Sequence, residues 1–426
     1  MKKTFLLCLS LLCIYTAMAQ IRGNEIRVVV SPDHTDWNYK LNEKCTFNIQ
    51  VWKAQNLLPD VTIDYELGPE MYPTEIKKGV VLKKGCLELK SSMKTPGFLR
   101  CKVVAHVDGR TYEGLATAGY EAEKLKPVTT LPDDFEGYWQ GQLSWARQTP
   151  LSTTMTLLPE RCTELDNVYQ VSYQVKPGGG RFYGILTIPK KEGNYPALLR
   201  VPGAGIRPYS GDTYTAPGKV IVLEVGIHGI PVNMEQSVYD AVYSGGLNNY
   251  WHFRSDSRDD FYYNRVVIGC VRGVDLICSL PQFNGKALGV TGSSQGGFLS
   301  VAVAALDNRV TFLAPVHPAL CDHEGFFNKR AGGWPHYFYH QEKPDAKKVE
   351  TAKYYDTANF ARLIKVPGWY SWGYNDPVCP PTSMHATYNI ITAPKELRLY
   401  LETQHFWYQE QWEEWQKWIV KQLNIE

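Results

Sequence analysis

The sequence lacks an excess of either charge and has only one long apolar run. Its 45 Lys and Arg residues face 43 Asp and Glu residues, and no stretch is strongly basic. Proteins that bind nucleic acid or anionic membranes depend on such a stretch, so neither partner is expected. The apolar run, residues 4–15, is shorter than the roughly 20 residues that a membrane-spanning helix needs, so no membrane span is expected either.

The spacings typical of metal sites are also missing. The sequence contains no C-x-x-C and no H-E-x-x-H, which are common zinc-binding patterns, so we predict neither a metal nor another cofactor. Ten cysteines are present but widely separated, unlike the dense spacing of small disulfide scaffolds. An oxidising compartment would permit pairing, but for most of them we expect a buried, apolar role.

The first residues have the composition of a secretory signal. Lys2 and Lys3 precede the apolar run, and the small-residue sequence Ala17-Met18-Ala19 follows it. We therefore predict a signal peptide over residues 1–19, cleavage before Gln20, and export to the periplasm or the cell exterior. Loss of Lys2 and Lys3 leaves 43 basic residues against 43 acidic ones, which makes the mature chain neutral.

Residues 20–128 consist of short stretches in which apolar and polar residues alternate. Turn signals such as Pro96-Gly97 and Asp108-Gly109 separate these stretches. This pattern predicts a β-sandwich of immunoglobulin-like size, with a hairpin around Asp108-Gly109. The segment shows no catalytic constellation, which favours a structural or docking role, with carbohydrate binding as the alternative.

Residues 129–426 alternate apolar runs with stretches of helical periodicity. Such alternation predicts an α/β fold with a mostly parallel sheet. Residues 321–353 are irregular and rich in aromatic rings, and we expect an insertion there that forms either an apolar wall or a sugar groove. The predicted buried strands are residues 195–201, 220–225, 287–290, 310–315, 366–373 and 397–401.

The most specific local pattern is Gly292-Ser293-Ser294-Gln295-Gly296, which follows an apolar run and precedes a helical one. Strand, G-x-S-x-G and helix in this order form the nucleophile elbow of α/β-hydrolases. The glycines let strand and helix backbones approach closely, and the turn exposes the serine oxygen. Ser294 is therefore the candidate nucleophile.

An acid and a base follow at the ends of later predicted strands. Asp376 comes after the strand at 366–373, and His405 after the strand at 397–401. Ser294, Asp376, His405 is the α/β-hydrolase order. Taken singly, Asp376 could be a turn residue before proline and His405 a surface histidine. Among the other histidines, His317 is the strongest rival as base, because it follows the strand after the elbow.

Two backbone amides are candidates for an oxyanion hole. In this fold one N–H belongs to the residue after the nucleophile, here Gln295. The other comes from the turn after an earlier strand, here Pro202-Gly203-Ala204-Gly205 after the strand at 195–201. We assign it to Ala204.

From Asp133 to the C-terminus, about two thirds of the chain, the sequence resembles the acetyl xylan esterase and cephalosporin C deacetylase family, carbohydrate esterase family seven. Three motifs carry the resemblance: Asp133-Asp-Phe-Glu-Gly-Tyr-Trp139, Gly292-Ser-Ser-Gln-Gly-Gly297 and Tyr374-Asn-Asp-Pro-Val-Cys-Pro-Pro381. The resemblance implies an α/β-hydrolase with Ser294, Asp376 and His405 as its triad. It also implies removal of acetyl groups from O-acetylated plant polysaccharide or oligosaccharide, and a homo-oligomer.

The sequence departs from the family pattern at two places near the site. His228-Gly229-Ile230 replaces Arg-Gly-Gln, and Gln404-His405-Phe406 replaces Gly-His-Glu. Because both lie near the site, the family's acetyl-sugar preference and hexameric assembly carry over less directly to this chain. Alternative functions are hydrolysis of another acyl substrate, such as a feruloyl ester or peptide, and glycan binding without catalysis. Because residues 20–125 supply no triad or oxyanion residue, we expect small esters to be hydrolysed without them.

Overall fold

The computed structural model describes residues 25–425. The predicted signal peptide and its cleavage position lie outside the described residues. Within residues 25–425, none of the helices combines the length and the apolar character needed to cross a membrane.

The N-terminal part of the chain is rich in β-structure, as predicted. It forms two sheets. In the four-stranded sheet β1, β4 and β7 each pair with β3, and the five-stranded sheet has the order β2-β9-β8-β5-β6. The strands are β1 (Ile26–Pro32), β2 (Asn38–Tyr39), β3 (Cys45–Lys53), β4 (Asn56–Leu57), β5 (Val61–Pro69), β6 (Glu75–Leu82), β7 (Cys86–Ser91), β8 (Gly97–Val107) and β9 (Arg110–Tyr120).

Both of these sheets contribute to one hydrophobic core. Phe47 and Ile49 come from the first sheet and Ile63 and Val103 from the second, and all four side chains are fully buried. The predicted hairpin is confirmed, since β8 and β9 pair antiparallel up to Val107 opposite Arg110. This core also includes Tyr374 and Ala386, which belong to the other half of the chain.

The C-terminal part contains a nine-stranded mixed sheet of order β10-β11-β12-β14-β13-β15-β16-β17-β18. The pairs from β10 to β14 are antiparallel, and those from β14 through β13 to β18 are parallel. The strands are β10 (Thr154–Leu157), β11 (Asp166–Gln174), β12 (Arg181–Pro189), β13 (Tyr195–Arg200), β14 (Ile221–Gly226), β15 (Phe283–Ser293), β16 (Phe312–Val316), β17 (Gly368–Trp372) and β18 (Lys395–Leu399).

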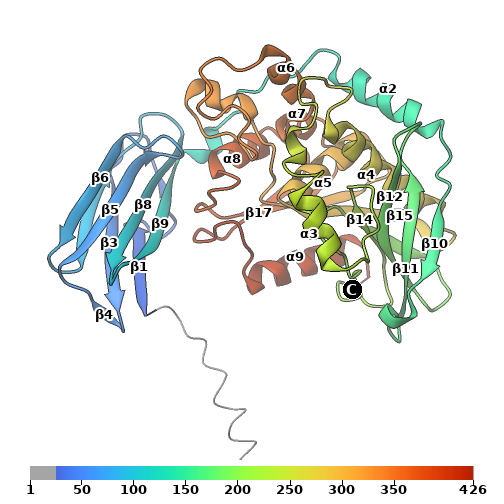
Figure 1. The fold of residues 1–426 in the computed structure, drawn as a ribbon, viewed down its shortest axis with the longest axis horizontal. Coiled ribbons are helices and arrows are strands. Elements are labelled where there is room, and N and C mark those ends of the chain that lie inside the picture. Colours follow the sequence, from blue (N-terminus) through green and yellow to red (C-terminus); the bar gives the residue numbers. More distant parts are fainter. Residues whose placement is uncertain (1–24, 426) are drawn as a thin grey trace, which may run out of the picture.

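Helices cover both faces of this sheet (Figure 1). Short 3-10 turns lie at η1 (Ala122–Lys124), η2 (Pro159–Arg161), η3 (Tyr250–His252) and η4 (His323–Asn328). The predicted irregular insertion ends early, because α6 begins at Ala346. The α-helices are α2 (Phe135–Arg147), α3 (Gln236–Ser244), α4 (Tyr262–Ser279), α5 (Gln295–Leu306), α6 (Ala346–Tyr354), α7 (Thr357–Ala361), α8 (Pro381–Asn389) and α9 (Gln409–Gln422).

Alternate residues of the central strands pack on opposite faces, as the two-residue period of a strand requires. Leu198 of β13 and Phe312 of β16 lie in the cluster that includes Trp415 of α9. Their neighbours Leu199 and Leu313 lie in the larger cluster that contains α4 and α5. The parallel part of the sheet therefore lies between α9 on one face and α4 and α5 on the other, and folds of this kind place their sites at the carboxyl ends of such strands.

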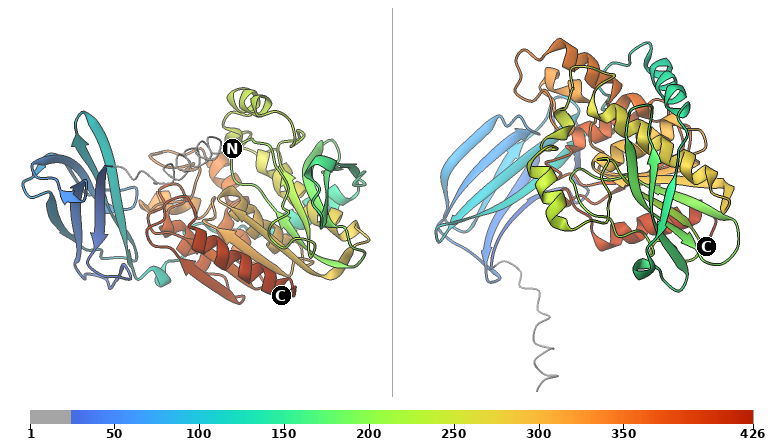
Figure 2. Two further views of the ribbon diagram at one scale, coloured as in Figure 1. Left: turned by 90° about the horizontal axis from the view of Figure 1, so that it is seen from below. Right: turned by 45° about the vertical axis from the view of Figure 1, so that its right-hand side comes forward.

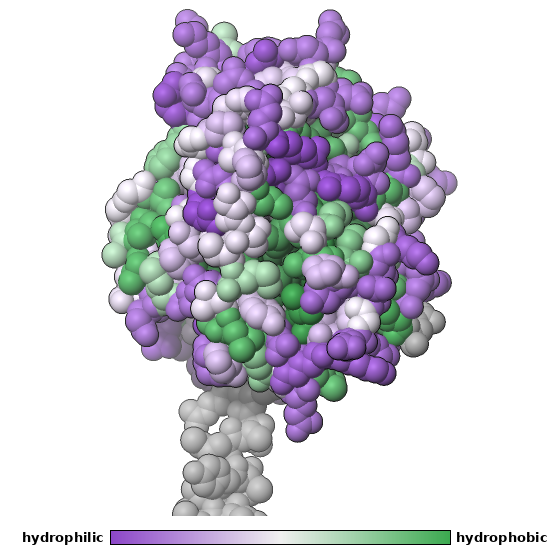
Figure 3. Space-filling view, turned by 90° about the vertical axis from the view of Figure 1, so that its right-hand side faces the viewer, coloured by the Kyte–Doolittle hydropathy of each residue, from purple (hydrophilic) through white to green (hydrophobic). Residues whose placement is uncertain are grey.

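The strand-rich unit, formed by β1 to β9, lies beside α8 and β17 (Figure 1), and the left view of Figure 2 shows it at one end of the molecule. It is tied there by hydrogen bonds from Asn389 Nδ2 to the carbonyls of Ala122 and Leu125. On the other side of the molecule, edge strand β10 exposes Met155 and Leu157. Figure 3 shows this side, where apolar residues are interspersed with hydrophilic ones.

Eight cysteines fall within the described residues, and all are unpaired there. Five are buried, which agrees with the small, apolar role expected from the sequence. The buried ones are Cys45, Cys101, Cys270, Cys321 and Cys379.

The family-like motif at α2 permits a matched stability test. Trp139 is fully buried and its Nε1 donates to the Tyr354 carbonyl at 3.2 Å, whereas Trp145 on the same helix is 40% exposed. Trp139→Ala should lower the free energy of unfolding by about 3–5 kcal/mol, and Trp145→Ala by less than about 1 kcal/mol. Urea unfolding measures both, and equal losses would contradict this account of the core.

Candidate active site

Ser294 occupies the strained turn between β15 and α5. Its backbone has φ 61° and ψ −121°, a conformation that costs a non-glycine residue free energy and is found at functional sites. Neighbouring segments hold it there: the Ser294 N–H donates to the Val316 carbonyl at 3.0 Å, and the Ser294 carbonyl accepts from the Ala319 N–H at 3.0 Å.

Gly292 and Gly296 of the motif lie against the chain just after β13, which leaves no room for a side chain. A Cβ added at Gly292 or at Gly296 would lie 2.5 Å from the Val201 carbonyl oxygen. No real Cβ contact is that short, so both positions require glycine if strand and helix are to keep this spacing. The elbow predicted from the sequence therefore has its expected geometry.

The structure brings Asp376 and His405 together. His405 Nδ1 lies 2.7 Å from Asp376 Oδ2, and Asp376 is fully buried while the His405 side chain is 25% exposed. The other carboxylate oxygen accepts from the N–H groups of Val378 at 2.8 Å and Cys379 at 2.9 Å. Because a carboxylate only accepts, His405 carries its proton on Nδ1, which leaves Nε2 free to accept a proton.

Cys379 lies next to this pair. Its side chain is fully buried, and its backbone N–H donates to Asp376 Oδ1. Burial raises the pKa of the Cys379 thiol well above its usual value, so the group stays a neutral thiol.

His317, the rival base, lies beside His405 with the ring centroids 4.3 Å apart. Its Nε2 lies 2.6 Å from the hydroxyl of Ser293, the residue before the candidate nucleophile. Burial, with a smaller contribution from nearby His405, lowers the pKa of His317 to about 3. A general base works best with a pKa near the working pH, so His317 is poorly suited to that role at neutral pH.

The two candidate oxyanion donors lie at adjoining segments. The first bond of α5 runs from the Phe298 N–H to the Ser294 carbonyl, so the Gln295 N–H precedes the intrahelical bonds. Ala204 lies in the turn after β13, where the Arg207 guanidinium donates to its carbonyl.

The Gln295 side chain connects these segments, which the sequence did not reveal. Its Nε2 donates to the Pro202 carbonyl at 3.2 Å, and its Oε1 accepts from the hydroxyls of Tyr250 at 2.6 Å and Tyr263 at 2.7 Å. Gln295 is fully buried, so this network fixes the turn after β13 relative to the elbow. The two tyrosines lie far upstream of the motif, at no characteristic spacing from it.

His228, one of the departures from the family pattern, supports the same turn. Its Nε2 lies 3.1 Å from the Gly205 carbonyl and its Nδ1 lies 2.8 Å from the Tyr262 hydroxyl. Burial lowers the pKa of His228 to about 4, so the ring is neutral near pH 7. A carbonyl only accepts, so Nε2 donates to Gly205 and Nδ1 accepts from Tyr262.

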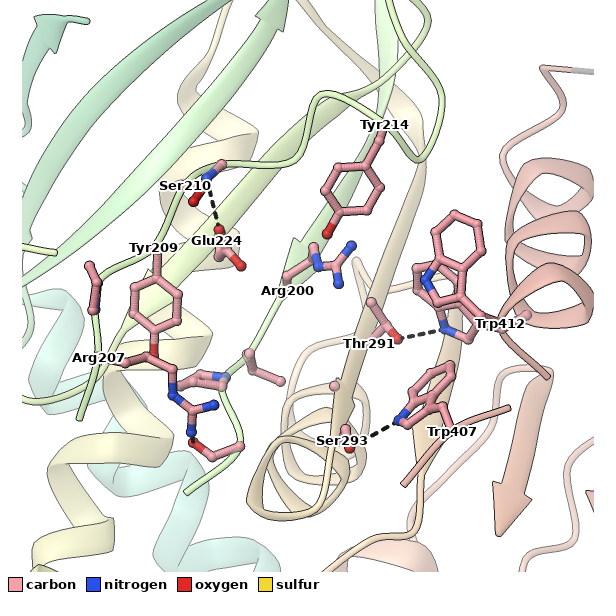
Figure 4. Close-up of a pocket in the computed structure, with 17 residues that line it drawn as sticks. Arg200, Arg207, Tyr209, Ser210, Tyr214, Glu224, Thr291, Ser293, Trp407 and Trp412 are labelled. Carbon is pink, nitrogen blue, oxygen red and sulfur yellow. Dashed lines mark hydrogen bonds between the residues drawn. The ribbon is translucent and has the colours of Figure 1, made fainter. Parts of the chain in front are cut away.

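A pocket of about 610 Å³ opens beside these residues (Figure 4). The triad side chains are not among its lining, but their neighbours Ser293 and Trp407 are. Tyr214 and Trp412 lie next to each other beside Arg200, with ring centroids 6.2 Å apart. Arg207 and Glu224 add polar groups to the wall, so the pocket combines aromatic faces with hydrogen-bonding groups.

One set of side chains in residues 25–425 has three metal-ligating atoms within 4.8 Å of one another: His317, Asp376 and His405. Asp376 Oδ2 and His405 Nδ1 already share a hydrogen bond, and His317 Nε2 contacts Ser293. Hydrogen bonding therefore accounts for this set, and we assign it no metal.

The mixed sheet and the serine elbow between β15 and α5 define an α/β-hydrolase-like fold. Within it, the chain belongs to the acetyl xylan esterase family (AXE1), whose family model matches residues 119–422. The protein is therefore a carboxylic ester hydrolase, and the resemblance inferred from the sequence is confirmed.

Individual relatives agree with this assignment. The chain is 37% identical over 399 residues to the acetyl esterase Axe7A of Xylanibacter ruminicola, a match that covers 92% of this chain and 90% of the relative. The solved acetyl xylan esterase from Paenibacillus sp. R4 is 27% identical, with a TM-score of 0.61, and covers 71% of this chain and 98% of its own. Acetyl xylan esterase 1 from Thermoanaerobacterium has the same TM-score and coverage at 23% identity. At that identity, the similarity demonstrates a shared fold only.

The lowered pKa of His317 predicts how stability depends on pH. Between about pH 6.5 and pH 3 the unfolded chain binds a proton at this residue and the folded chain does not, so the free energy of unfolding falls as the pH falls, by up to about 1.4 kcal/mol per pH unit. His317→Gln should therefore lose less stability between pH 6.5 and pH 4.5. Urea unfolding at several pH values measures the slope, and an unchanged slope would contradict the prediction.

Proposed function

We propose that this protein is an exported serine esterase that removes acetyl groups from O-acetylated plant polysaccharide or oligosaccharide. The observation that carries the proposal is the 2.7 Å contact between His405 and Asp376, in an acetyl xylan esterase family chain that has Ser294 at a strained elbow. No cofactor is required by this chemistry.

In the proposed mechanism Ser294 is the nucleophile. His405 Nε2 accepts the Ser294 hydroxyl proton as the oxygen attacks the ester carbonyl, and Asp376 holds the ring tautomer and stabilises the imidazolium. The tetrahedral intermediate collapses, and the sugar oxygen leaves as a hydroxyl by taking that proton from His405. Water, activated by the same histidine, then hydrolyses the acyl-enzyme and releases acetate.

The amides of Gln295 and Ala204 stabilise the oxyanion in both steps. A pre-arranged donor is effective because it needs no reorganisation when charge develops. The bond from the Gln295 side chain to Pro202 supports this assignment, since it keeps the two donors at a constant separation. His228 supports the same turn through the Gly205 carbonyl.

The aromatic pocket is the proposed place for the sugar. Flat C–H faces of pyranose rings stack on aromatic side chains, and their hydroxyls bond to charged groups. Tyr214 and Trp412 provide such faces, and Arg207 and Glu224 such groups. A feruloyl ester is the second candidate substrate, because the same rings could stack on a phenolic acyl group.

The remaining parts of the proposal concern organisation and location. We propose that the mature chain begins at Gln20 after removal of a signal peptide, and that it acts in the periplasm or outside the cell. Residues 20–128 would form an immunoglobulin-like sandwich and residues 129–426 the hydrolase. A homo-oligomer is also proposed, by analogy with the family.

The triad is tested by comparing variants at two neighbouring histidines. Ser294→Ala and His405→Ala should each lower kcat for p-nitrophenyl acetate by at least about 10³-fold. His317→Gln should cost far less, because His317 is not the base. If the His317 variant is inactive and the His405 variant is not, the assignment of the base is wrong.

The sugar pocket is tested with a large and a small substrate. Trp412→Ala should raise KM for an acetylated xylo-oligosaccharide about 2- to 12-fold, the equivalent of about 0.5–1.5 kcal/mol for one lost stacking contact, and leave kcat/KM for p-nitrophenyl acetate unchanged. Trp145→Ala, an exposed tryptophan on α2 away from the pocket, is the matched control. Equal changes for both substrates would show that the pocket does not hold the sugar.

A further inference from the structure

One arginine of the strand-rich unit reaches the loop that carries Asp376. Arg100 lies on β8, and its side chain is only 12% exposed. Its Nη2 donates to the carbonyl of Tyr374 at 3.0 Å and to the carbonyl of Asp376 at 3.1 Å. A single guanidinium nitrogen therefore bonds the backbone of the candidate acid and the backbone two residues before it.

A buried glutamate extends this contact to the far end of the loop. Glu70 is 2% exposed and lies 2.7 Å from Arg100. Its second oxygen accepts from the Thr382 backbone N–H at 3.1 Å and from the Thr382 hydroxyl at 2.6 Å. Thr382 lies in the first turn of α8, so Arg100 and Glu70 together bond both ends of the loop between β17 and α8.

Other contacts from the strand-rich unit hold the residues that flank Asp376. Asn375 Nδ2 donates to the Leu115 carbonyl at 3.1 Å, and the Tyr374 hydroxyl donates to Asn38 Oδ1 at 2.9 Å. The Phe98 ring packs edge-on against Tyr374 with centroids 4.8 Å apart. These contacts hold the backbone before the acid from several directions.

We propose that the strand-rich unit positions the catalytic acid, and that Arg100 is the positioning residue through which it acts. The proposal rests on the proposed triad, because positioning Asp376 matters only if Asp376 serves His405. Asp376 must hold the His405 ring in one tautomer and orientation, and catalysis is sensitive to errors of about 1 Å in such geometry. The loop has no strand or helix of its own between Trp372 and Pro381, so its backbone depends on contacts with other segments, and Arg100 supplies two of them.

The charges favour a positioning role over a purely stabilising one. Burying an ion pair often adds little net stability compared with apolar packing, but its hydrogen bonds fix the geometry of the groups around it. Arg100 and Glu70 bond the loop that carries Asp376, and Arg100 also bonds Thr117, whose hydroxyl accepts from Arg100 Nε at 2.9 Å. Under this proposal, removal of residues 20–125 should impair hydrolysis of small esters, contrary to the expectation from the sequence.

The test compares two basic residues on the same strand in the full chain. Arg100→Ala should lower kcat for p-nitrophenyl acetate by about 10- to 100-fold with KM within about twofold. Lys102→Ala is the matched control, since Lys102 is 40% exposed and pairs only with the exposed Glu113, and it should retain the kcat of the parent protein. Glu70→Gln preserves shape but removes the charge on the partner of Arg100, and it should give a smaller loss of kcat.

A double-variant cycle separates positioning from general destabilisation. If Arg100 acts through Asp376, Arg100→Ala should change kcat by less than about twofold in an Asp376→Asn background, because no carboxylate remains to be positioned. A purely structural role would lower kcat by the same factor in both backgrounds and would overturn the proposal. Arg100→Lys, which keeps the charge and loses the forked geometry, should restore part of kcat if folding of the alanine variant is impaired.

Failure of this proposal differs from failure of the proposed function. If Asp376→Asn leaves kcat unchanged, the triad itself is wrong. If Asp376→Asn is nearly inactive and Arg100→Ala behaves like Lys102→Ala, the triad stands and the positioning role is refuted.

Discussion

The structure depends on the close approach of β13 to the elbow between β15 and α5. The Val201 carbonyl oxygen would lie 2.5 Å from a Cβ at Gly292 or at Gly296. Because glycine has no side chain, the end of β13 and the start of α5 can lie side by side. The side-chain amide of Gln295 then reaches the turn after β13. The strained backbone of Ser294 and the bond from Gln295 to Pro202 both follow from this contact.

Local patterns predicted much of this architecture. The glycine motif identified the elbow, and the order of apolar runs placed Asp376 and His405 after β17 and β18, where the structure brings them within 2.7 Å. The hairpin at β8 and β9 was predicted from its turn residues. Element ends were less accurate, as for β18, which ends at Leu399 instead of residue 401, because fraying and capping, not periodicity, decide where an element stops.

Contacts between distant segments could not be predicted in this way. Tyr250 and Tyr263 bond the Gln295 side chain, and Ser293 bonds His317, but none of these residues has a characteristic spacing from its partner. Arg100 looked like an ordinary polar residue of an alternating strand, since a period of two reports only which face a side chain occupies. The two carbonyls that it bonds in the Asp376 loop lie more than 270 residues further along the chain.

The core of the strand-rich unit includes Tyr374 and Ala386, so the boundary between the two halves in sequence is not a boundary in packing. Heat or denaturant that melts this core removes the apolar environment of the β17–α8 segment as well. We therefore expect the two parts to unfold together, and a cut in the connecting chain near Lys126 should not release them from each other. Selection on the esterase therefore also acts on residues that never touch its substrate.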